Sequence, residues 1–329
     1  VFAQHQDISE RPEMYRTGES QEAVSNTILG AFKAGKVNGH FRYFNMFTDN
    51  QKNLTDYYAN AAGGGLRFET AKFHNFHFAI SGFYIFNIGS SDLTKADPHT
   101  GQANRYEIGL FDIEDPSNKR DIDRLEELYL GYSMKKSSVK IGRQLLNSPF
   151  INLQDGRMRP TGIEALWTEI NEIKNVRIEG GWIYAISPRS TTKWFDIGET
   201  IGIYPSGLNV DGSPSTYSGN VESNGIAMAA VHYQAGKNLK LQAWNMFTDN
   251  VFNSAMLRAD LNLPLKNNSA IVLAGQFIRQ DAVNKGGNED QRHTYFQEGT
   301  GSASFGAKFA LKNQDWEASV NYNRITSEG

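Results

Sequence analysis

The sequence predicts an all-β protein, a transmembrane antiparallel β-barrel with a short helix before the first barrel strand. Three observations lead to this prediction. Apolar and polar residues alternate with a period of two over most of the chain, short turns and long loops follow each other strictly, and 12% aromatic residues occur together with 31 glycines. A barrel strand needs an apolar residue only at every second position, so a mean hydropathy of −0.51 does not conflict with a membrane location.

Composition excludes several classes of function. A net charge of −3 gives no basis for nucleic-acid binding. The chain contains no cysteine, which excludes disulfide frameworks, cysteine–zinc sites and thiol catalysis. No stretch approaches the ~18 consecutive apolar residues of a membrane-spanning helix.

Residues 1–35 are expected to form a polar N-terminal segment with one short helix. Between Glu22 and Lys33 the apolar residues recur at helical spacing, and Gly35 follows as a stop signal. The remainder, 36–329, is expected to form the barrel.

Thirteen segments then alternate with period two and are predicted as strands. They cover residues 37–47, 57–69, 76–87, 124–134, 138–144, 161–170, 175–187, 223–234, 238–248, 253–265, 269–279, 301–311 and 315–326.

The connections between these strands alternate between tight and long. Six are tight turns, and the others are mostly long, with the largest at 88–123, 145–160, 188–222 and 280–300. This alternation is typical of an outer-membrane barrel with tight periplasmic turns and long outer loops. A soluble sandwich has no reason to place its long loops at one end. Because a bacterial single-chain barrel has an even number of strands, the odd number leads us to expect that the chain is a fragment or that its remainder is missing.

Basic residues predominate on the strand face expected to line the channel. This face carries seven of them, Arg42, Arg67, Lys140, Arg177, Lys240, Arg258 and Lys308. Four acids share it, Glu69, Glu179, Asp260 and Glu317. Fixed cations in a pore favour anions and carboxylates because they replace part of the solute's hydration. A second interpretation stays open, in which the charges wet a wide pore and pair with opposite neighbours.

The loop 145–160 combines two prolines with apolar and charged residues. Three apolar side chains in an exposed loop predict that the loop folds inward and narrows the channel. The candidate constriction residues are Phe150, Asp155, Arg157 and Arg159. The alternative is a loop packed on the barrel rim with Asp155 paired to Arg157.

Catalytic motifs do not occur in the sequence. The seven histidines are scattered, and neither His-Glu-x-x-His nor Gly-x-Ser-x-Gly is present. The acidic stretch 112–123 lacks the spacing of an EF-hand calcium loop. We therefore predict no enzyme activity, no cofactor and no metal. A barrel enzyme or a barrel subunit of an envelope complex remains the alternative.

Several motifs near the loop 145–160 resemble one family. They are Leu128-Tyr-Leu-Gly-Tyr132, Val139-Lys-Ile-Gly-Arg-Gln144, Ser148-Pro-Phe150, Asp155-Gly-Arg-Met-Arg-Pro160, Trp167, Asn171-Glu-Ile173 and Gly180-Gly-Trp182. Together they resemble the OprD family of outer-membrane porins, over roughly residues 36–326.

The resemblance implies an 18-stranded barrel in the outer membrane of a Gram-negative bacterium, acting as a monomer or a loose homotrimer. It implies passive diffusion of small water-soluble solutes, anionic or amino-acid-like and carboxylate-bearing, with lipid and lipopolysaccharide around the barrel. The family's inward-folding third long loop maps to 145–160, where Asp155 and Arg157 match the motif. Its ladder of basic residues maps to Lys140 and Arg177, and by parity to the other basic residues of the channel face.

Overall fold

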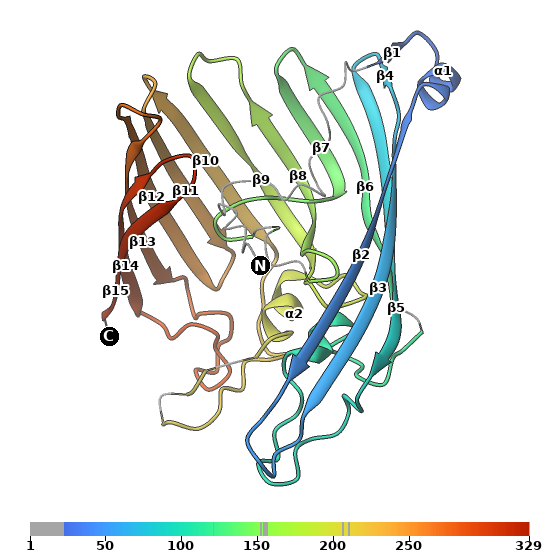
Figure 1. Cartoon of the computed structure of the whole chain (residues 1–329), viewed down its shortest axis with the longest axis vertical. Coiled ribbons are helices and arrows are strands. Elements are labelled where there is room, and N and C mark those ends of the chain that lie inside the picture. Colours follow the sequence, from blue (N-terminus) through green and yellow to red (C-terminus); the bar gives the residue numbers. More distant parts are fainter. Residues whose placement is uncertain are drawn as a thin grey trace. The chain divides into compact units, whose positions relative to one another are not determined.

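A computed structural model describes residues 23–120, 122–151, 153, 157–205, 207–209 and 211–328 (Figure 1). Most of the predicted N-terminal segment, residues 1–22, lies outside the described residues, as does Asp155. The chain divides into two compact units. The first contains residues 1–132, 140–165 and 185–195, and the second contains 133–139, 166–184 and 196–329.

All thirteen predicted strands occur, each within a few residues of its expected bounds. They are β2 (Lys36–Thr48), β3 (Tyr57–Glu69), β5 (Phe76–Ser90), β6 (Asp123–Met134), β7 (Ser137–Gln144), β8 (Gly162–Ile170), β9 (Val176–Ser187), β10 (Ile226–Ala235), β11 (Leu239–Thr248), β12 (Phe252–Pro264), β13 (Ala270–Ala282), β14 (Gly301–Lys312) and β15 (Glu317–Glu328). Two strands of two residues, β1 (Val24–Ser25) and β4 (Lys72–Phe73), were not expected. The helical elements are α1 (Ile28–Lys33), α2 (Ile197–Gly202) and the 3₁₀ turn η2 (Glu107–Leu110). No helix among the described residues has the length and apolarity to cross a membrane.

Asparagine makes several of the tight turns possible. Asn75, Asn175, Asn267 and Asn268 have positive φ angles of 69°, 63°, 58° and 54°. Asparagine tolerates this left-handed conformation because its short polar side chain can bond locally, whereas most side chains clash there. The strands on either side of each turn can therefore reverse within a few residues.

In the first unit, β2, β3, β5 and β6 pair antiparallel in that order. One face of this sheet exposes large apolar side chains, among them Phe41, Leu66, Ile80 and Phe86, and we call it the bare face. The opposite face is covered by loops and is called the loop-covered face. In β6 one extra residue interrupts the alternation, because Ser81 pairs with Glu127 whereas Gly82 pairs with Leu125.

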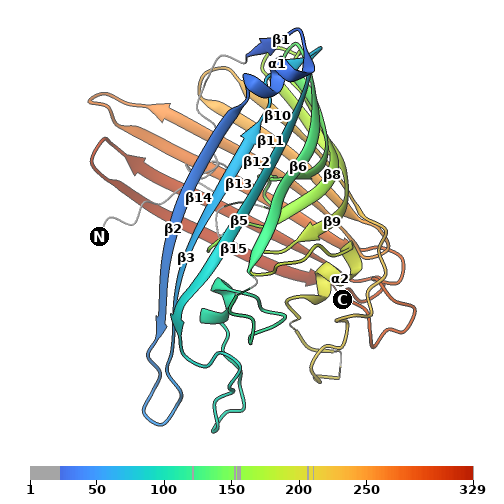
Figure 2. The same cartoon turned by 90° about the vertical axis from the view of Figure 1, so that its right-hand side faces the viewer.

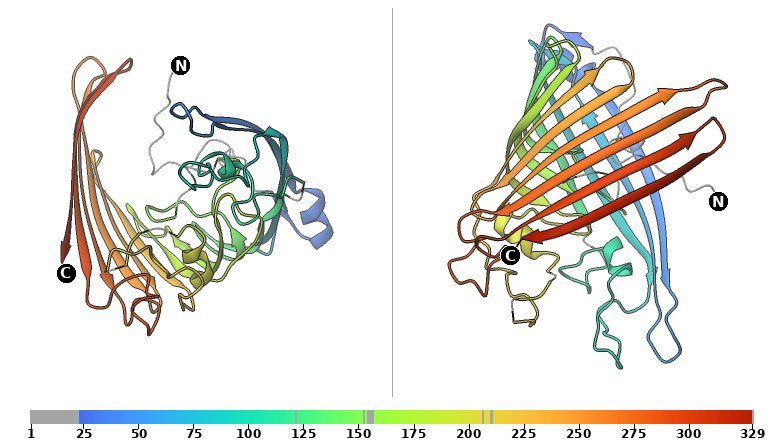
Figure 3. Two further views of the ribbon diagram at one scale, coloured as in Figure 1. Left: turned by 90° about the horizontal axis from the view of Figure 1, so that it is seen from below. Right: turned by 90° about the vertical axis from the view of Figure 1, so that its left-hand side faces the viewer.

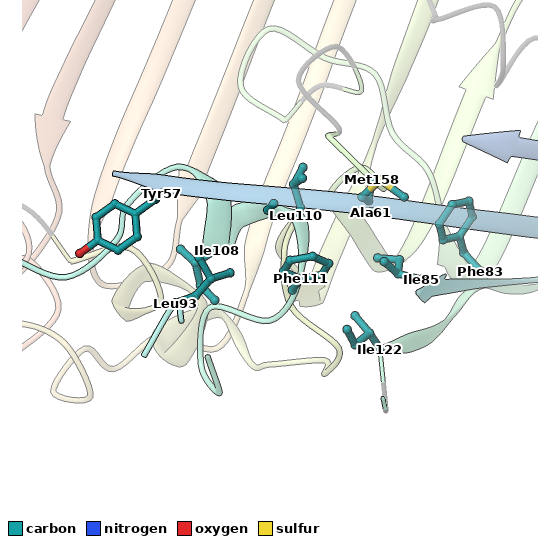
Figure 4. Close-up of a cluster of buried hydrophobic side chains, with 11 residues drawn as sticks. Tyr57, Ala61, Phe83, Ile85, Leu93, Ile108, Leu110, Phe111, Ile122 and Met158 are labelled. Carbon is teal, nitrogen blue, oxygen red and sulfur yellow. The ribbon is translucent and has the colours of Figure 1, made fainter. Parts of the chain in front are cut away.

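The loop after β5 packs onto the loop-covered face of the first unit and forms a hydrophobic core there. This core joins strand residues to residues of the loop 91–122 and to Met158 from the segment before β8 (Figure 4). Its members are Tyr57, Ala59, Ala61, Phe83, Ile85, Leu93, Ile108, Leu110, Phe111, Ile122 and Met158. The loop 91–122 therefore packs against the sheet, whereas the sequence predicted such folding for the loop 145–160.

Helix α1 begins later than predicted. The Thr27 hydroxyl accepts a hydrogen bond from the Gly30 amide at 3.0 Å and caps the helix at its first turn. The residues before it extend instead, because β1 pairs in parallel with β4. Figure 2 shows α1 at the turn end of β3 and β5, opposite the end that carries the loop 91–122.

In the second unit, β9 to β15 pair antiparallel in chain order, and β10 to β15 can be followed as neighbouring strands in Figure 3. Register links Arg177 to His232, His232 to Gln242 and Gln242 to Arg258. These residues share a face with the buried Trp244 and Met256. The opposite, bare face exposes Val231, Leu241, Leu257, Leu273 and Phe305.

Two long loops contact the end of the second unit's face that carries Arg177 and Trp244, and we call this face its loop-covered face. The rings of Tyr217 and Tyr295 meet at a centroid distance of 5.0 Å, and Tyr295 also lies 5.8 Å from Phe252 at the start of β12. The amide of Glu222 donates to the Gly287 carbonyl at 2.8 Å and joins the two loops. Both units therefore have one bare apolar face and one loop-covered face.

Candidate functional site

Three loop segments of the first unit meet over its loop-covered face, and we call their meeting point the loop junction. It consists of residues 104–113, 157–161 and 187–195. The Ile113 amide donates to the Ser190 carbonyl at 3.0 Å, and the Ser190 hydroxyl donates to the Gly109 carbonyl. The Arg157 guanidinium donates from Nη1 to the Tyr106 carbonyl at 3.3 Å. The junction holds the segment after 156 in a defined place.

Arg124, near the start of β6, is the main anchor of the loop junction. Its Nη1 donates to the Ser187 carbonyl, the Ser187 hydroxyl and the Pro188 carbonyl at 3.2, 2.9 and 3.2 Å. Its Nη2 donates to the Pro160 carbonyl at 2.5 Å and pairs with Glu126 at 3.1 Å. One side chain of the sheet therefore binds two of the three loop segments, in a fully buried position where such bonds are strongest.

Arg159 lies inside the loop junction rather than on a free surface. The residue is 1% exposed, and Nη2 donates to the Thr191 carbonyl at 2.7 Å. Among the residues that the structure describes, its Nε and Nη1 have no hydrogen-bond partner. Burial, with the like charge of Arg124 nearby, lowers the pKa of Arg159 to about 9. The sequence predicted a channel-facing guanidinium here, whereas the structure encloses it in protein.

Arg157 is half-buried and has a positive φ of 44°. Its guanidinium lies directly against the backbone of Gly109, where any Cβ would overlap Nη1. A side chain at position 109 would therefore have to displace the Arg157 guanidinium. This contact fixes the position of the Arg157 charge relative to the loop 91–122.

Two buried carboxylates fix the loop 91–122 itself. Glu107 is 1% exposed, and its carboxylate accepts hydrogen bonds from the Thr48 hydroxyl and the Asn104 amide, both at 2.5 Å. Asp112 accepts a hydrogen bond from the Thr192 hydroxyl at 2.9 Å. The loop is thereby tied both to the end of β2 and to the segment 187–195.

The first part of the loop 145–160 is also folded against the protein. Leu153 is buried, and Phe150 is half-buried. The Ser148 hydroxyl accepts a hydrogen bond from the Ile151 amide at 2.9 Å and closes a turn around Phe150. The structure therefore places Arg157 and Arg159 at the loop junction and Phe150 in this turn, while Asp155 is outside the described residues.

The predicted channel-lining basic residues of the first unit contact acids and aromatic rings of the loop-covered face. Arg67 donates to Glu127, Glu69 and the Tyr129 hydroxyl at 2.8, 2.7 and 2.9 Å. Lys140 lies over the ring of Tyr129 at 5.2 Å from its centroid. Arg42 stands in the same way over the ring of Phe44, at 5.4 Å.

In the second unit the same pattern recurs. Three predicted basic residues form ion pairs with acids of the same face, Arg177 with Glu179 at 2.8 Å, Arg258 with Asp260 at 2.8 Å and Lys308 with Glu317 at 2.6 Å. His232 also bonds Glu179, at 2.7 Å. All four predicted acids of the channel face are therefore paired, counting Glu69 with Arg67.

Lys240 differs from these residues. Within the part of the chain that the structure describes, it forms no ion pair, although register places it opposite Asp260. It lines a pocket of about 320 Å³ together with Arg177, His232 and Gln242. This pocket presents cationic and amide donors without a carboxylate in its wall.

Sequence reasoning missed the anchors of the loop junction. Arg124 precedes the bulge of β6, which made the phase of that strand ambiguous in the sequence. Glu107 is a single acid in a long loop, and its partners Thr48 and Asn104 give no periodic signal. The pattern Asp-Gly-Arg-Met-Arg-Pro did not separate the half-buried Arg157 from the fully buried Arg159.

Comparisons with known proteins place the chain in a family. The sequence model described as outer membrane porin, OprD family, matches residues 112–327, which is more than half of the chain. A comparison with curated protein sequences finds no match.

Several solved structures have a similar fold. OccD3 (OpdP) of Pseudomonas aeruginosa is 12% identical, with a TM-score of 0.66 over 98% of this chain and 65% of that one. OccAB3 of Acinetobacter baumannii is 16% identical, with a TM-score of 0.69 over 90% of this chain and 67% of that one. OpdK of Pseudomonas aeruginosa, solved with vanillate, is 14% identical, with a TM-score of 0.65 over 90% of this chain and 68% of that one.

The chain thus spans about two thirds of the length of these porins. Their shared fold is a β-barrel, in agreement with the alternating strands and apolar bare faces described above. Together with the family match, this locates the protein in the bacterial outer membrane. The chain belongs to the OprD family of outer membrane porins.

Proposed function

We propose that this protein is a passive diffusion channel for small water-soluble solutes, favours those that bear a carboxylate, and performs no chemistry on them. The observation that carries the proposal is the loop junction. Arg124 and Asp112 tie three loops together over the loop-covered face, and Glu107 ties one of them to the end of β2. A channel that selects among solutes needs such a fixed narrowing.

Within this proposal the four constriction candidates have different roles. Arg157 and Phe150 contact the solute, because both are half-buried and partly accessible. Arg159 positions the loop instead, since its guanidinium is enclosed. Asp155 keeps its role as a constriction residue on the basis of its place in the motif alone.

The preference for carboxylates is supported by the charges of the loop-covered faces. Lys240 lines a pocket that has no carboxylate among its lining residues, so its charge is less neutralised than those of Arg67 and Arg177, which form ion pairs. Vanillate, held by the similar porin OpdK, carries a carboxylate. Acids on the same faces reduce the net field, so we expect a moderate preference for anions.

Single-channel conductance of the purified protein in planar bilayers tests the proposal. Stable conductance steps are expected. Gly109→Ala places a Cβ against the Arg157 guanidinium and should displace it, which changes the single-channel conductance. Gly89→Ala is the matched control, because a Cβ there meets nothing within 4 Å and should leave the conductance unchanged.

Two outcomes would count against the proposal. Folded protein that gives no conductance steps is not a channel. Equal conductance for the wild type and Gly109→Ala, with both variants folded, would place the narrowing away from the loop junction.

A further inference from the structure

Helix α1 packs on the bare face of the first unit, outside the sheet. The ring of Phe32 stacks on Phe68 at 6.0 Å and lies 6.5 Å from Phe78. Register puts both rings on the bare face, since Phe68 pairs with Ile80 and Phe78 pairs with Leu130. In an outer-membrane barrel this face meets lipid.

The position of α1 is fixed by its backbone. The Ala71 amide donates to the Ala31 carbonyl at 3.0 Å, and the Lys72 amide donates to the Ala23 carbonyl at 2.9 Å. These bonds join α1 and β1 to the tight turn between β3 and β5 (Figure 1). Tight turns of such barrels lie on the periplasmic side, so α1 is held at the periplasmic rim of the wall.

Exposed apolar residues extend from this helix. Leu29 is 66% exposed, Ile28 is 62% exposed and Val24 is 72% exposed. They continue the apolar surface that Leu66 and Phe76 form on the adjoining strands. Lys33 and Lys36 follow directly and are also exposed, which places cations at the border of this apolar surface.

We propose that α1 is an interfacial membrane anchor that inserts Ile28 and Leu29 into the periplasmic leaflet of the outer membrane. Lys33 and Lys36 then reach the phosphate groups of the phospholipids. Apolar side chains bordered by lysines are the composition of helices that lie in the plane of a bilayer surface. A protein partner fits less well, because a six-residue helix is far smaller than the ~1,000 Å² total area of a stable interface.

Depth-dependent fluorescence quenching tests the anchor. The chain has no cysteine, so Leu29→Cys and Ile28→Cys each accept a single environment-sensitive label. Lys266→Cys, in the exposed tight turn after β12, is the matched control. The labelled full chain is placed in phospholipid nanodiscs, which leave both rims accessible, with a quencher either on the lipid acyl chain or, as iodide, in water.

The label at position 29 or 28 should lose roughly half of its emission to the lipid-borne quencher and little to iodide, because interfacial helices lie about 5–10 Å into the boundary. The label at 266 should show the reverse. Heat-modifiable mobility on gels and unchanged conductance check that each variant is folded.

Three results would overturn the anchor. The first is that the labels at 28 and 29 respond to iodide as strongly as the label at 266. The second is that these labels are protected from iodide only at a high protein-to-lipid ratio, which would indicate a second copy of the chain. The third is that they are protected only after a periplasmic extract is added, which would indicate a protein partner.

Discussion

The two buried arginines of the loop junction differ in how far hydrogen bonds and ion pairs compensate their charges. Arg124 donates hydrogen bonds in several directions and pairs with Glu126, so its charge is compensated. Arg159 donates one hydrogen bond, to the Thr191 carbonyl, and two of its buried donors have no partner in the described part of the chain. A buried donor without a partner costs about 1–3 kcal/mol. Arg124 therefore stabilises the junction, whereas burial of the Arg159 guanidinium makes an unfavourable contribution to the free energy of folding.

The two arginines should respond differently to replacement by methionine. Arg124→Met leaves Glu126 buried without its partner and should lower the free energy of unfolding by roughly 3–5 kcal/mol. Arg159→Met removes the unpartnered donors at similar volume and should change it by about 1 kcal/mol or less. Urea unfolding in lipid vesicles, followed by tryptophan fluorescence, measures both. A larger loss for Arg159→Met would refute the assignment of Arg124 as the anchor.

Only part of the loop junction could be predicted from the sequence. The motif around Arg157 located the loop, and its prolines and apolar residues indicated inward folding. The burial of Arg159 depends on Thr191 and Arg124, which are 32 and 35 positions away in the sequence. No pattern in the segment itself reports such neighbours.

At the scale of elements, the loop 91–101 has its own internal support. The Asp97 carboxylate accepts hydrogen bonds from the backbone amides of Thr100, Thr55 and His99 at 2.8, 2.6 and 3.0 Å. These amides, first that of Thr100 and then that of Thr55, hold the pKa of Asp97 well below its ordinary value. The group therefore joins this loop to the loop 49–56 more strongly when it is ionised than when it is protonated.

The stabilisation by Asp97 should be lost in acid. Its folded-state pKa is depressed, so the contribution is present above the unfolded value of about 3.9 and disappears as the pH falls toward the folded value. Hydrogen exchange at the amides of Thr55 and Thr100, corrected for intrinsic rates, should show protection at pH 6 that declines below about pH 4. Asp97→Asn should lack this pH dependence. Equal decline in the variant would assign the effect to another group.

Strands were predictable because their signal is local and repeated. Each of the thirteen long strands spans at least eight residues, long enough for a period of two to show, and antiparallel pairing of neighbours needs no distant information. The strand β1 gave no signal, since two residues cannot show a period and their pairing with β4 is set by the docking of α1. That docking also shortened the helix expected from Glu22 to Lys33.

At the scale of the whole molecule, the charges of the loop-covered faces are mostly arranged in pairs. Four of the predicted basic residues form ion pairs, namely Arg67, Arg177, Arg258 and Lys308, as expected if these charges pair with opposite neighbours. Lys240 lines a pocket of cationic and amide groups, and its role in attracting anions stays a prediction. We expect the field of the channel to depend on a few weakly compensated cations.

The reversal potential under a salt gradient tests this distribution. The wild type should prefer anions moderately, and the preference should weaken as salt rises from about 0.1 M to 1 M, because the screening length falls from about 10 Å to 3 Å. Lys240→Gln should reduce the preference, whereas Lys266→Gln, in an exposed turn, should leave it unchanged. Cation preference in the wild type would contradict the proposed carboxylate selectivity.

The extra residue in β6 shifts the alternation of side chains by one position, so residues three positions apart can lie on the same face. Arg124 and Glu127 are three positions apart, yet register places both on the loop-covered face. The strand can therefore supply Glu126 to the arginine that anchors the loops and Glu127 to Arg67 in the sheet. A chain that lost one residue here would turn one of these charges toward lipid. The loop junction and the barrel wall are thus coupled at this strand, because an insertion or deletion here would alter the contacts of both.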